Sequence, residues 1–183
     1  LAKACGPESA RWIHWGATTQ DVIDTGLVLQ MHDGLNLIES DVNAVIDALK
    51  RLASVHRKTV MAGRTFQQQA APVTFGFKAA VWLDEMLRHR QRLPDLRRRA
   101  LVCQYGGAVG TLSSLGKDGL KVRRELARKL ELEDPAISWH TARDGWAELT
   151  HWLAMVAATL GKIATEIAML MRTEVDEVRE PYQ

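Results

Sequence analysis

The stretch from Met61 to Gly76 contains a set of groups suited to binding a carboxylate. Its fixed cation, Arg64, is followed by Thr65 and by glutamines at positions 67–69, which are uncharged hydrogen-bonding groups. A guanidinium donates two parallel hydrogen bonds to a carboxylate, and hydroxyl and amide groups donate further ones. The stretch therefore predicts an anion-binding segment. An ordinary polar connection between two helices is the competing interpretation.

Two other polar segments interrupt the apolar patterns, from Trp12 to Asp21 and from Ala136 to Asp144. Their side chains with donor or proton-transfer capacity are His14, Thr18, Thr19, His140 and Arg143. Histidine titrates near neutral pH, and hydroxyl and guanidinium groups donate hydrogen bonds to carboxylates. Because the helical patterns between them are apolar, we expect the function to lie where the three polar segments converge. One interpretation of His14 is a buried histidine bonded to nearby backbone.

Helices must position these polar segments. From Asp21 to His56 no proline occurs and apolar residues recur in steps of three and four, which predicts one long helix, bent near Gly34. Thr18 or Thr19 would cap its first turn, and Asp21 would lie near the positive end of the helix dipole.

Two further helices and a glycine-rich break are predicted next. The second helix would begin at Pro72, with Pro94 as a kink or an interruption. The run from Gly106 to Thr111 lacks the lysine and spacing of a phosphate-binding loop, so we expect its backbone to pack closely against a neighbouring helix. A short, charged surface helix is expected from Gly116 to Glu133.

The last helical pattern is the most regular. Its apolar residues step by three and four in a heptad seam, at Trp146, Leu149, Leu153, Val156, Leu160, Ile163, Ile167 and Leu170. Such a seam is typical of helices packed nearly parallel in a bundle. No strand pattern of similar quality is present, so the predicted fold class is all-α. Other copies of the chain are expected to bury part of these long helices, and the polar segments are expected to meet across subunits.

The amino-acid composition of the chain bears on its possible partners, which could include nucleic acids, membranes or metals. The chain has 183 residues, 46% of them apolar, and 24 Lys and Arg against 22 Asp and Glu, so its net charge of +2 favours neither a nucleic-acid nor a membrane partner. The basic run from Arg88 to Arg99 is expected to be a solvated helix face. Cys5 and Cys103 have no metal-ligand spacing, which indicates a reduced, metal-free, cytoplasmic protein.

The apolar stretches are interrupted by charges, so no membrane span or leader is expected. The chain begins with Leu1 and stops just after a helix terminator, so we expect both ends to be cut from a longer protein.

The polar segments resemble the signatures of the fumarase/aspartase superfamily, helical lyases that add or eliminate across a carbon–carbon bond next to a carboxylate. The run from His14 to Thr25, HWGATTQDVIDT, is similar to the first signature in its adenylosuccinate lyase form. Gly63 to Gly76 is similar to the second signature. The runs Gly106 to Thr111 and Arg172 to Val175, with Glu180-Pro181, extend the resemblance over essentially the whole chain.

One position favours a branch of the superfamily. Most members have a histidine directly after Gly-Arg-Thr, where this chain has Phe66, and an aromatic ring cannot relay a proton. A bulky aromatic followed by glutamines and Ala-x-Pro-Val-Thr-Phe-Gly resembles the bacterial 3-carboxy-cis,cis-muconate cycloisomerases. The run from Trp139 to Asp144 is also similar to that branch, except that Ala142 replaces the usual glutamine.

The resemblance implies a cofactor-free reaction, in which 3-carboxy-cis,cis-muconate becomes 4-carboxymuconolactone during protocatechuate degradation. The site residues that it implies are His14, for proton transfer or substrate orientation, and, for substrate binding, Thr18, Thr19, Arg64, Thr65, Gln68, His140 and Arg143. It further implies a homotetramer with sites shared between subunits. A catalytic loop with a Ser and a Lys would follow Glu180-Pro181, so residues 1–183 would be the central helical domain of a longer enzyme, inactive alone.

Three alternatives stay open. The first is another lyase of the superfamily, such as adenylosuccinate lyase, in which a histidine in place of Phe66 would be neutral or helpful. The second is a cycloisomerase for a sulfonated muconate, because sulfonate and carboxylate call on the same donors. The third is a non-catalytic helical scaffold that binds a partner through its seams, whose function would survive replacement of Arg64 by alanine.

Overall fold

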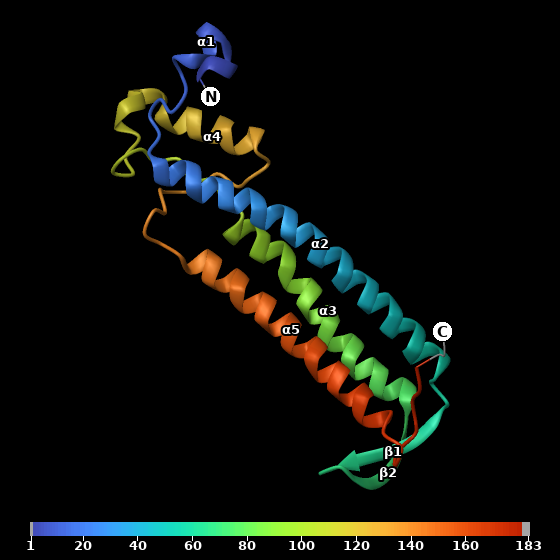
Figure 1. The fold of residues 1–183 in the computed structure, drawn as a ribbon. Coiled ribbons are helices and arrows are strands. Elements are labelled where there is room, and N and C mark those ends of the chain that lie inside the picture. The colour runs from blue at the N-terminus through green and yellow to red at the C-terminus, as the bar shows by residue number, and fades with distance from the viewer. Residues whose placement is uncertain (1, 181–183) are drawn as a thin grey trace. The chain divides into compact units, whose positions relative to one another are not determined.

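A computed structural model describes residues 2–180, so Pro181 of the last motif lies outside the described residues. The elements, drawn in Figure 1, are η1 (Ala2–Ala4), α1 (Gly6–Ala10), α2 (Thr19–Val55), β1 (Val60–Thr65), β2 (Gln68–Thr74), α3 (Phe75–Ala100), η2 (Ser113–Asp118), α4 (Gly119–Lys129) and α5 (Asp144–Leu170). With 64% of the chain helical, the all-α class is confirmed.

The chain divides into two compact units. The first unit consists of the residues up to Asn36 together with Pro94–Leu149. The second consists of Leu37–Leu93 together with the residues from Thr150 onward. Helices α2, α3 and α5 each contribute residues to both units.

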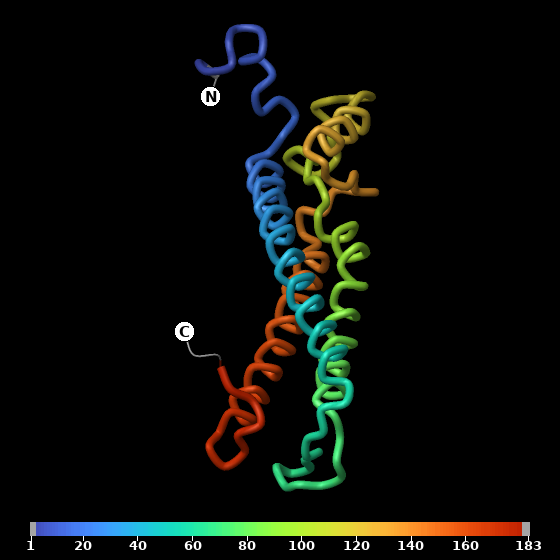
Figure 2. The backbone as a smooth tube through the Cα atoms, turned by 90° about the vertical axis from the view of Figure 1, so that its right-hand side faces the viewer, coloured from blue at the N-terminus to red at the C-terminus, as the bar shows by residue number. Residues whose placement is uncertain are grey.

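The second unit is a three-helix arrangement with an apolar centre. Its parts of α2, α3 and α5 lie side by side in both views of the backbone (Figures 1 and 2). Its buried apolar side chains are Val42, Ile46, Leu49, Met61, Ala79, Trp82, Met86, Leu93, Trp152, Val156, Ile163 and Leu170. They recur on each helix at the three- and four-residue spacing of a single face, which confirms the predicted long-helix packing for this unit.

The buried face of α5 follows the predicted heptad seam only in part. Val156 and Ile163 are buried as predicted. Thr159 is buried in place of Leu160, which is 37% exposed, and Trp152 is buried one residue before the predicted position. A helix turns by 3.6 rather than 3.5 residues, so the face that a straight helix buries drifts away from a strict heptad. One apolar edge of α5 is consequently exposed in this chain.

Helix α5 is also long and apolar enough, by length and composition alone, to cross a membrane. Its mean hydropathy reaches 1.6, and 22% of that apolar window is buried. As the sequence predicted, charges interrupt this helix: Lys162 pairs with Glu85, and Glu166 pairs with Lys78. Both partners lie on α3, so these ion pairs join α5 to α3 within the second unit.

A β-hairpin joins α2 to α3, and here the expectation of a polar break without strands is wrong. Strands β1 and β2 pair antiparallel, and Phe66 and Gln67 form the connection between them. Both connecting residues have positive φ, 50° and 62°, as a type I′ turn requires at its two central positions. Neither is the Gly, Asn or Asp that signals this turn in a sequence, which is why the hairpin was not predicted.

The predicted helix start at Pro72 is wrong, and Pro94 does not interrupt its helix. Pro72 lies in β2 opposite Ala62, and α3 begins later, after Thr74, whose hydroxyl accepts the Phe77 N–H at 3.1 Å. Pro94 lies inside α3, which continues to Ala100 without interruption. A Thr side chain therefore starts this helix, as an N-cap does, instead of a proline at its first position.

The first unit surrounds the beginning of α2 with the end of α3, with α4 and with long loops. Its buried apolar side chains are Val28, Leu35, Leu96, Ala100, Leu101, Cys103, Leu112, Ala127, Leu132 and Leu149. Helix α4 is shorter than predicted, and it is not wholly a surface helix. Arg123, on its inner face, is 6% exposed and its Nε donates to Asp134 Oδ1 at 2.7 Å. The predicted helix from Asp21 to His56 is confirmed as α2, which passes Gly34 unbroken.

Candidate functional site

Asp21, in the first turn of α2, is the central acceptor of the first unit. It is 1% exposed, and both carboxylate oxygens are used. Oδ1 accepts hydrogen bonds from Gln104 Nε2 at 3.1 Å and from the Gly106 N–H at 3.0 Å. Oδ2 accepts from the N–H groups of Thr18 and Gly107, both at 2.9 Å. One buried side chain thus joins the first polar segment to the glycine-rich run.

These hydrogen bonds decide the charge of Asp21. Burial raises the pKa of the carboxyl group, but hydrogen bonds from Thr18, His140, Gly107 and Gln104 outweigh it, so the pKa lies below its ordinary value. Asp21 is therefore a carboxylate at neutral pH. It also closes the first turn of α2 through the Thr18 N–H, a task that the sequence assigned to the hydroxyl of Thr18 or Thr19.

His140 is held by Asp21. Its Nε2 lies 2.6 Å from Asp21 Oδ1, and its side chain is 16% exposed. The His140 carbonyl accepts hydrogen bonds from Gln20 Nε2 and from Arg143 Nη2, both at 2.8 Å. Because a carboxylate only accepts, Nε2 carries the proton and Nδ1 is left to exchange one. The arrangement fixes an imidazole in the way that hydrolase triads orient their histidine.

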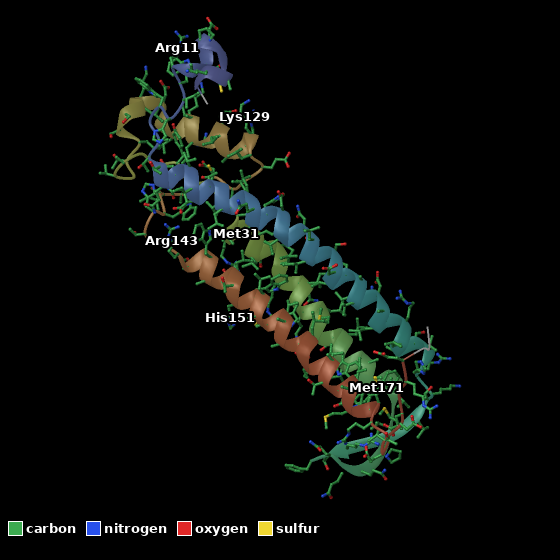
Figure 3. All side chains as sticks on the ribbon, viewed as in Figure 1. Arg11, Met31, Lys129, Arg143, His151 and Met171 are labelled. Carbon is green, nitrogen blue, oxygen red and sulfur yellow. The ribbon has the colours of Figure 1, made fainter. Side chains whose placement is uncertain are left out.

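Arg143, labelled in Figure 3 just before α5, lies against two indole rings that contact each other edge to face. Its guanidinium carbon lies 5.5 Å from the Trp139 ring centroid and 4.6 Å from that of Trp146. Its Nη2 donates to Asp24 Oδ2 at 3.0 Å. The buried Nη1 has no hydrogen-bond partner within residues 2–180. These contacts orient the Arg143 guanidinium and leave a buried donor without an acceptor in the described part of the chain.

Close packing of the glycine-rich run is confirmed, but its neighbours are loops rather than a helix. A Cβ on Gly106 would lie 2.4 Å from Ser138 Oγ. Gly107 has a φ of +77°, and a Cβ there would lie 2.9 Å from the Gly16 carbonyl oxygen. The absence of side chains lets both amides reach Asp21, so this run binds an internal carboxylate.

Gln104 fixes the loop that carries His140. Its backbone N–H donates to Thr25 Oγ1 at 3.0 Å, and the same hydroxyl donates back to the Gln104 carbonyl at 2.8 Å. Its side-chain oxygen accepts from the Trp139 N–H at 3.0 Å, and its Nε2 also donates to Ser138 Oγ at 2.9 Å. Gln104 is therefore a positioning residue of the site, one that the sequence did not reveal.

His14 and Thr19 lie at the exposed side of this region. His14 is exposed, with a φ of 63°, so the interpretation as a buried histidine is wrong. It borders an open, mainly apolar cavity of about 410 Å³ that Asp21 and Tyr105 also line. The Tyr105 hydroxyl donates to the Trp15 carbonyl at 2.5 Å and so holds the backbone beside His14. Thr19 is the exposed first residue of α2.

The remaining predicted residues belong to the second unit. Arg64, Thr65 and Gln68 lie on the hairpin, with Thr65 opposite Gln68 and both exposed beside the turn. Arg64 makes the two-pronged carboxylate contact that its type predicts, but the partner is Glu177 of the same chain. The structure thus groups His14, Thr18, Thr19, His140 and Arg143 in one unit, and Arg64, Thr65 and Gln68 in the other.

Comparisons with known proteins agree with this architecture. A family model described as Lyase matches residues 2–183. The chain is 46% identical over 182 residues to N-acetyl-S-(2-succino)cysteine lyase of Dickeya dadantii, covering 100% of this chain and 40% of that protein. It is 46% identical over 188 residues to 3-carboxy-cis,cis-muconate cycloisomerase of Pseudomonas putida, covering 99% and 44%.

Solved structures give the same result. A crystal structure of a fumarate lyase from Mesorhizobium sp. BNC1 superposes with a TM-score of 0.93 at 53% identity, over 98% of this chain and 42% of that one. The chain therefore spans about two fifths of the length of its relatives. Since a family model matches nearly every residue, the chain belongs to the lyase family of the fumarase/aspartase superfamily.

Proposed function

We propose that the protein containing this chain is a cofactor-independent, cytoplasmic cycloisomerase that converts 3-carboxy-cis,cis-muconate to 4-carboxymuconolactone. In this isomerisation one substrate carboxylate oxygen forms a bond to a carbon of the diene. A proton is added to the neighbouring carbon, which lies next to another carboxylate, so the substrate trianion takes up one proton and becomes a lactone dianion. The fully protonated forms of substrate and product are isomers. The 46% identity to the Pseudomonas putida cycloisomerase supports this reaction.

Phe66 carries the proposal. Most members of the superfamily have a histidine at this position, and a phenyl ring can neither donate nor accept a proton. Phe66 is 100% exposed at the turn between β1 and β2, so it adds nothing to the apolar core of its own chain. Its ring is free to contact a substrate or another subunit. An aromatic group at this site favours a reaction that does not use the missing histidine.

The first unit would bind one end of the substrate. Thr18 and Thr19 would donate to a carboxylate at the beginning of α2, where the helix dipole also favours negative charge. His14 would orient the substrate or share in proton transfer from the edge of the cavity. His140, oriented by Asp21, is a second candidate for proton transfer. Donors fixed in this way stabilise the negative charge that develops beside the protonated carbon.

The hairpin would serve another carboxylate through Thr65 and Gln68, with Arg64 beside them. The candidate residues are divided between two units. We therefore propose a homotetramer in which each site combines residues of different subunits. Exposed apolar side chains on all three long helices, among them Ile23, Val81 and Leu160, support such an assembly.

A second candidate reaction is elimination of a thiol from an S-succinyl compound. It is favoured by the 46% identity to the Dickeya dadantii lyase, which extends over the whole of this chain. In this elimination a proton next to a carboxylate is removed and the carbon–sulfur bond breaks, giving an unsaturated dicarboxylate and a thiol. Both candidate reactions need groups that donate hydrogen bonds to the substrate carboxylates. They differ in the bond that is made or broken.

The test uses the protein expressed at its full natural length, with a chelator present. Loss of the conjugated diene absorbance of 3-carboxy-cis,cis-muconate is expected, and Phe66→His is expected to create no cleavage of adenylosuccinate. A matched variant, Phe66→Tyr, retains an aromatic ring and should retain most of the lactonisation. Adenylosuccinate cleavage by the wild type, stimulated by Phe66→His, would instead assign the protein to the adenylosuccinate lyase branch.

A further inference from the structure

The contact between Arg64 and Glu177 joins the hairpin to the segment after α5. Arg64 Nη1 lies 2.7 Å from Glu177 Oε2, and Nη2 lies 3.1 Å from Oε1. The two side chains are only 20% and 23% exposed. This is the two-pronged geometry in which arginine binds carboxylates most strongly. The hydrogen bond from Arg64 lowers the pKa of Glu177, and the same bond raises the pKa of Arg64, so both stay charged at neutral pH.

The pair also contacts the backbone of the hairpin. Ala62 lies opposite Pro72, which has no N–H to offer to the strand pairing. The Ala62 N–H donates to Glu177 Oε1, and the Ala62 carbonyl accepts from Arg64 Nη1, both at a long 3.4 Å. The ladder is also irregular between Ala62 and Arg64. The ion pair therefore supports β1 where the strand pairing is weakest.

A substrate carboxylate could take the end-on face of the Arg64 guanidinium, formed by Nη1 and Nη2, only by displacing Glu177. The displaced carboxylate would lose a bidentate partner and a backbone N–H at once. Two other cations, Lys78 and Arg172, line a cavity of about 270 Å³ together with Arg64. Lys78 is already paired with Glu166. Substrate binding at this face in place of Glu177 would thus leave the Glu177 carboxylate without its guanidinium partner.

We propose that Arg64 is a positioning residue, and not a substrate ligand. Together with Glu177 it clamps the hairpin to the segment after α5 and acts through Thr65 and Gln68, the exposed residues next to the turn. This inference rests on the proposed function where it concerns the substrate. The clamp itself does not depend on which substrate is bound.

The decisive comparison is between Arg64→Gln and Glu177→Gln in the full-length protein. A clamp predicts that each variant lowers kcat/KM for 3-carboxy-cis,cis-muconate by about tenfold and that the double variant is no worse, because both changes remove one interaction. If Arg64 instead bound the substrate directly, Glu177→Gln would free its guanidinium for the substrate. KM would then fall or stay the same in Glu177→Gln, while Arg64→Gln alone would lose activity. This result would overturn the proposal.

The exchanged pair, Arg64→Glu with Glu177→Arg, adds a rescue test. Partial recovery of kcat/KM, relative to either single charge reversal, supports the clamp. A glutamate at position 64 would repel a substrate carboxylate if that position bound it directly. The matched control is Asp176→Asn, which removes the neighbouring carboxylate, paired with Arg179, without touching the hairpin. If the exchanged pair does not fold, the comparison of Arg64→Gln with Glu177→Gln still distinguishes a clamp from a substrate ligand.

A measurement without substrate separates the clamp from the proposed function. Amide hydrogen exchange of residues 60–74 should accelerate at least about tenfold, to the same extent, in Arg64→Gln and Glu177→Gln, and should not change in Asp176→Asn. Unchanged exchange in both glutamine variants would overturn the clamp whatever the substrate. Accelerated exchange in a protein that consumes no muconate would retain the clamp and reject the cycloisomerase assignment.

Discussion

His140 Nε2 lies 2.6 Å from Asp21 Oδ1, although 119 positions separate the two residues. The contact connects the beginning of α2 to the loop before α5. The same carboxylate binds the amides of Gly106 and Gly107. Two of the three polar segments, residues 12–21 and 136–144, therefore meet within the first unit around a carboxylate of the protein itself.

Replacing Asp21 tests how much the stability of the first unit depends on the carboxylate charge of this residue. Asp21→Asn puts an NH₂ group in place of an oxygen that accepts from buried donors. It should lower the free energy of unfolding by roughly 3 kcal/mol, as expected when hydrogen bonds to a buried charge are lost. Denaturant titration measures this change. Asp41→Asn, at an exposed position of α2, should stay within about 0.5 kcal/mol of wild type. Equal effects of the two variants would contradict the assigned role.

The pH dependence of stability provides an independent check on Asp21. Its folded-state pKa lies below the ordinary value of 3.8, so its contribution is fully present above that value and is lost as the pH falls through the folded pKa. The stability difference between wild type and Asp21→Asn should therefore be constant from pH 7 to pH 5 and shrink below about pH 4. If the stability difference instead grew on acidification, the folded-state pKa of Asp21 would lie above its ordinary value, and the prediction would be contradicted.

His89 should make the second unit sensitive to mild acid. It is 5% exposed, its Nε2 lies 2.9 Å from Thr159 Oγ1, and burial, assisted by the charge of Arg92, lowers its pKa. The unfolded chain then binds a proton more readily than the folded chain, so stability falls as the pH drops below about 6.5, by at most about 1.4 kcal/mol per pH unit. His89→Gln should reduce this slope, and His151→Gln, at an exposed position of α5 (Figure 3), should not. Identical slopes in all three proteins would contradict the prediction.

Two glycines should respond in opposite directions to an added methyl group. Gly107→Ala meets the Gly16 carbonyl oxygen at 2.9 Å and requires a φ of +77°, so it should destabilise the protein by about 1–3 kcal/mol. Gly34→Ala has open space inside α2 and should stabilise it by up to about 1 kcal/mol. Thermal unfolding of the two variants measures both changes. A shift in the same direction for both would contradict the conformations described here.

The exposed edge of α5 tests the proposed tetramer. Leu160, 37% exposed within one chain, would be buried if other copies packed against this helix. Leu160→Glu should then shift the full-length protein towards smaller species in light scattering coupled to size exclusion. Glu174→Gln, at an exposed position after α5, is the control and should leave the mass unchanged. A wild-type mass of a single subunit would reject the shared site.

The long helices could be predicted because their signal is local. Residues three and four positions apart, such as Val42, Ile46 and Leu49, already show the buried face of α2. The hairpin could not be predicted, because Phe66 and Gln67 adopt positive φ without the residue types that favour it. The contact of Arg64, which lies on the same hairpin, with Glu177 also leaves no local signal in the sequence.

The types of residue in the candidate site could be predicted from the sequence, but their hydrogen-bond partners could not. His140 and Arg143 stood out by type, yet Asp21 looked like an ordinary first-turn carboxylate. Its bond to Gln104 spans 83 positions and leaves no periodic signal in the sequence. Glu177 is similarly hidden, since it lies 113 positions from Arg64. A sequence pattern identifies groups that can bind a carboxylate, whereas the fold decides which of them are already occupied by one.

The most direct test of the proposed activity is a comparison of kcat/KM for three substrates with one preparation of the full-length protein. The substrates are 3-carboxy-cis,cis-muconate, N-acetyl-S-(2-succino)cysteine and adenylosuccinate. We expect the muconate to be converted at least about a hundredfold more efficiently than the other two, a difference of about 2.7 kcal/mol in transition-state stabilisation. Preferred cleavage of the succinylated cysteine, with the diene left intact, would contradict the cycloisomerase assignment and favour the thiol-eliminating lyase.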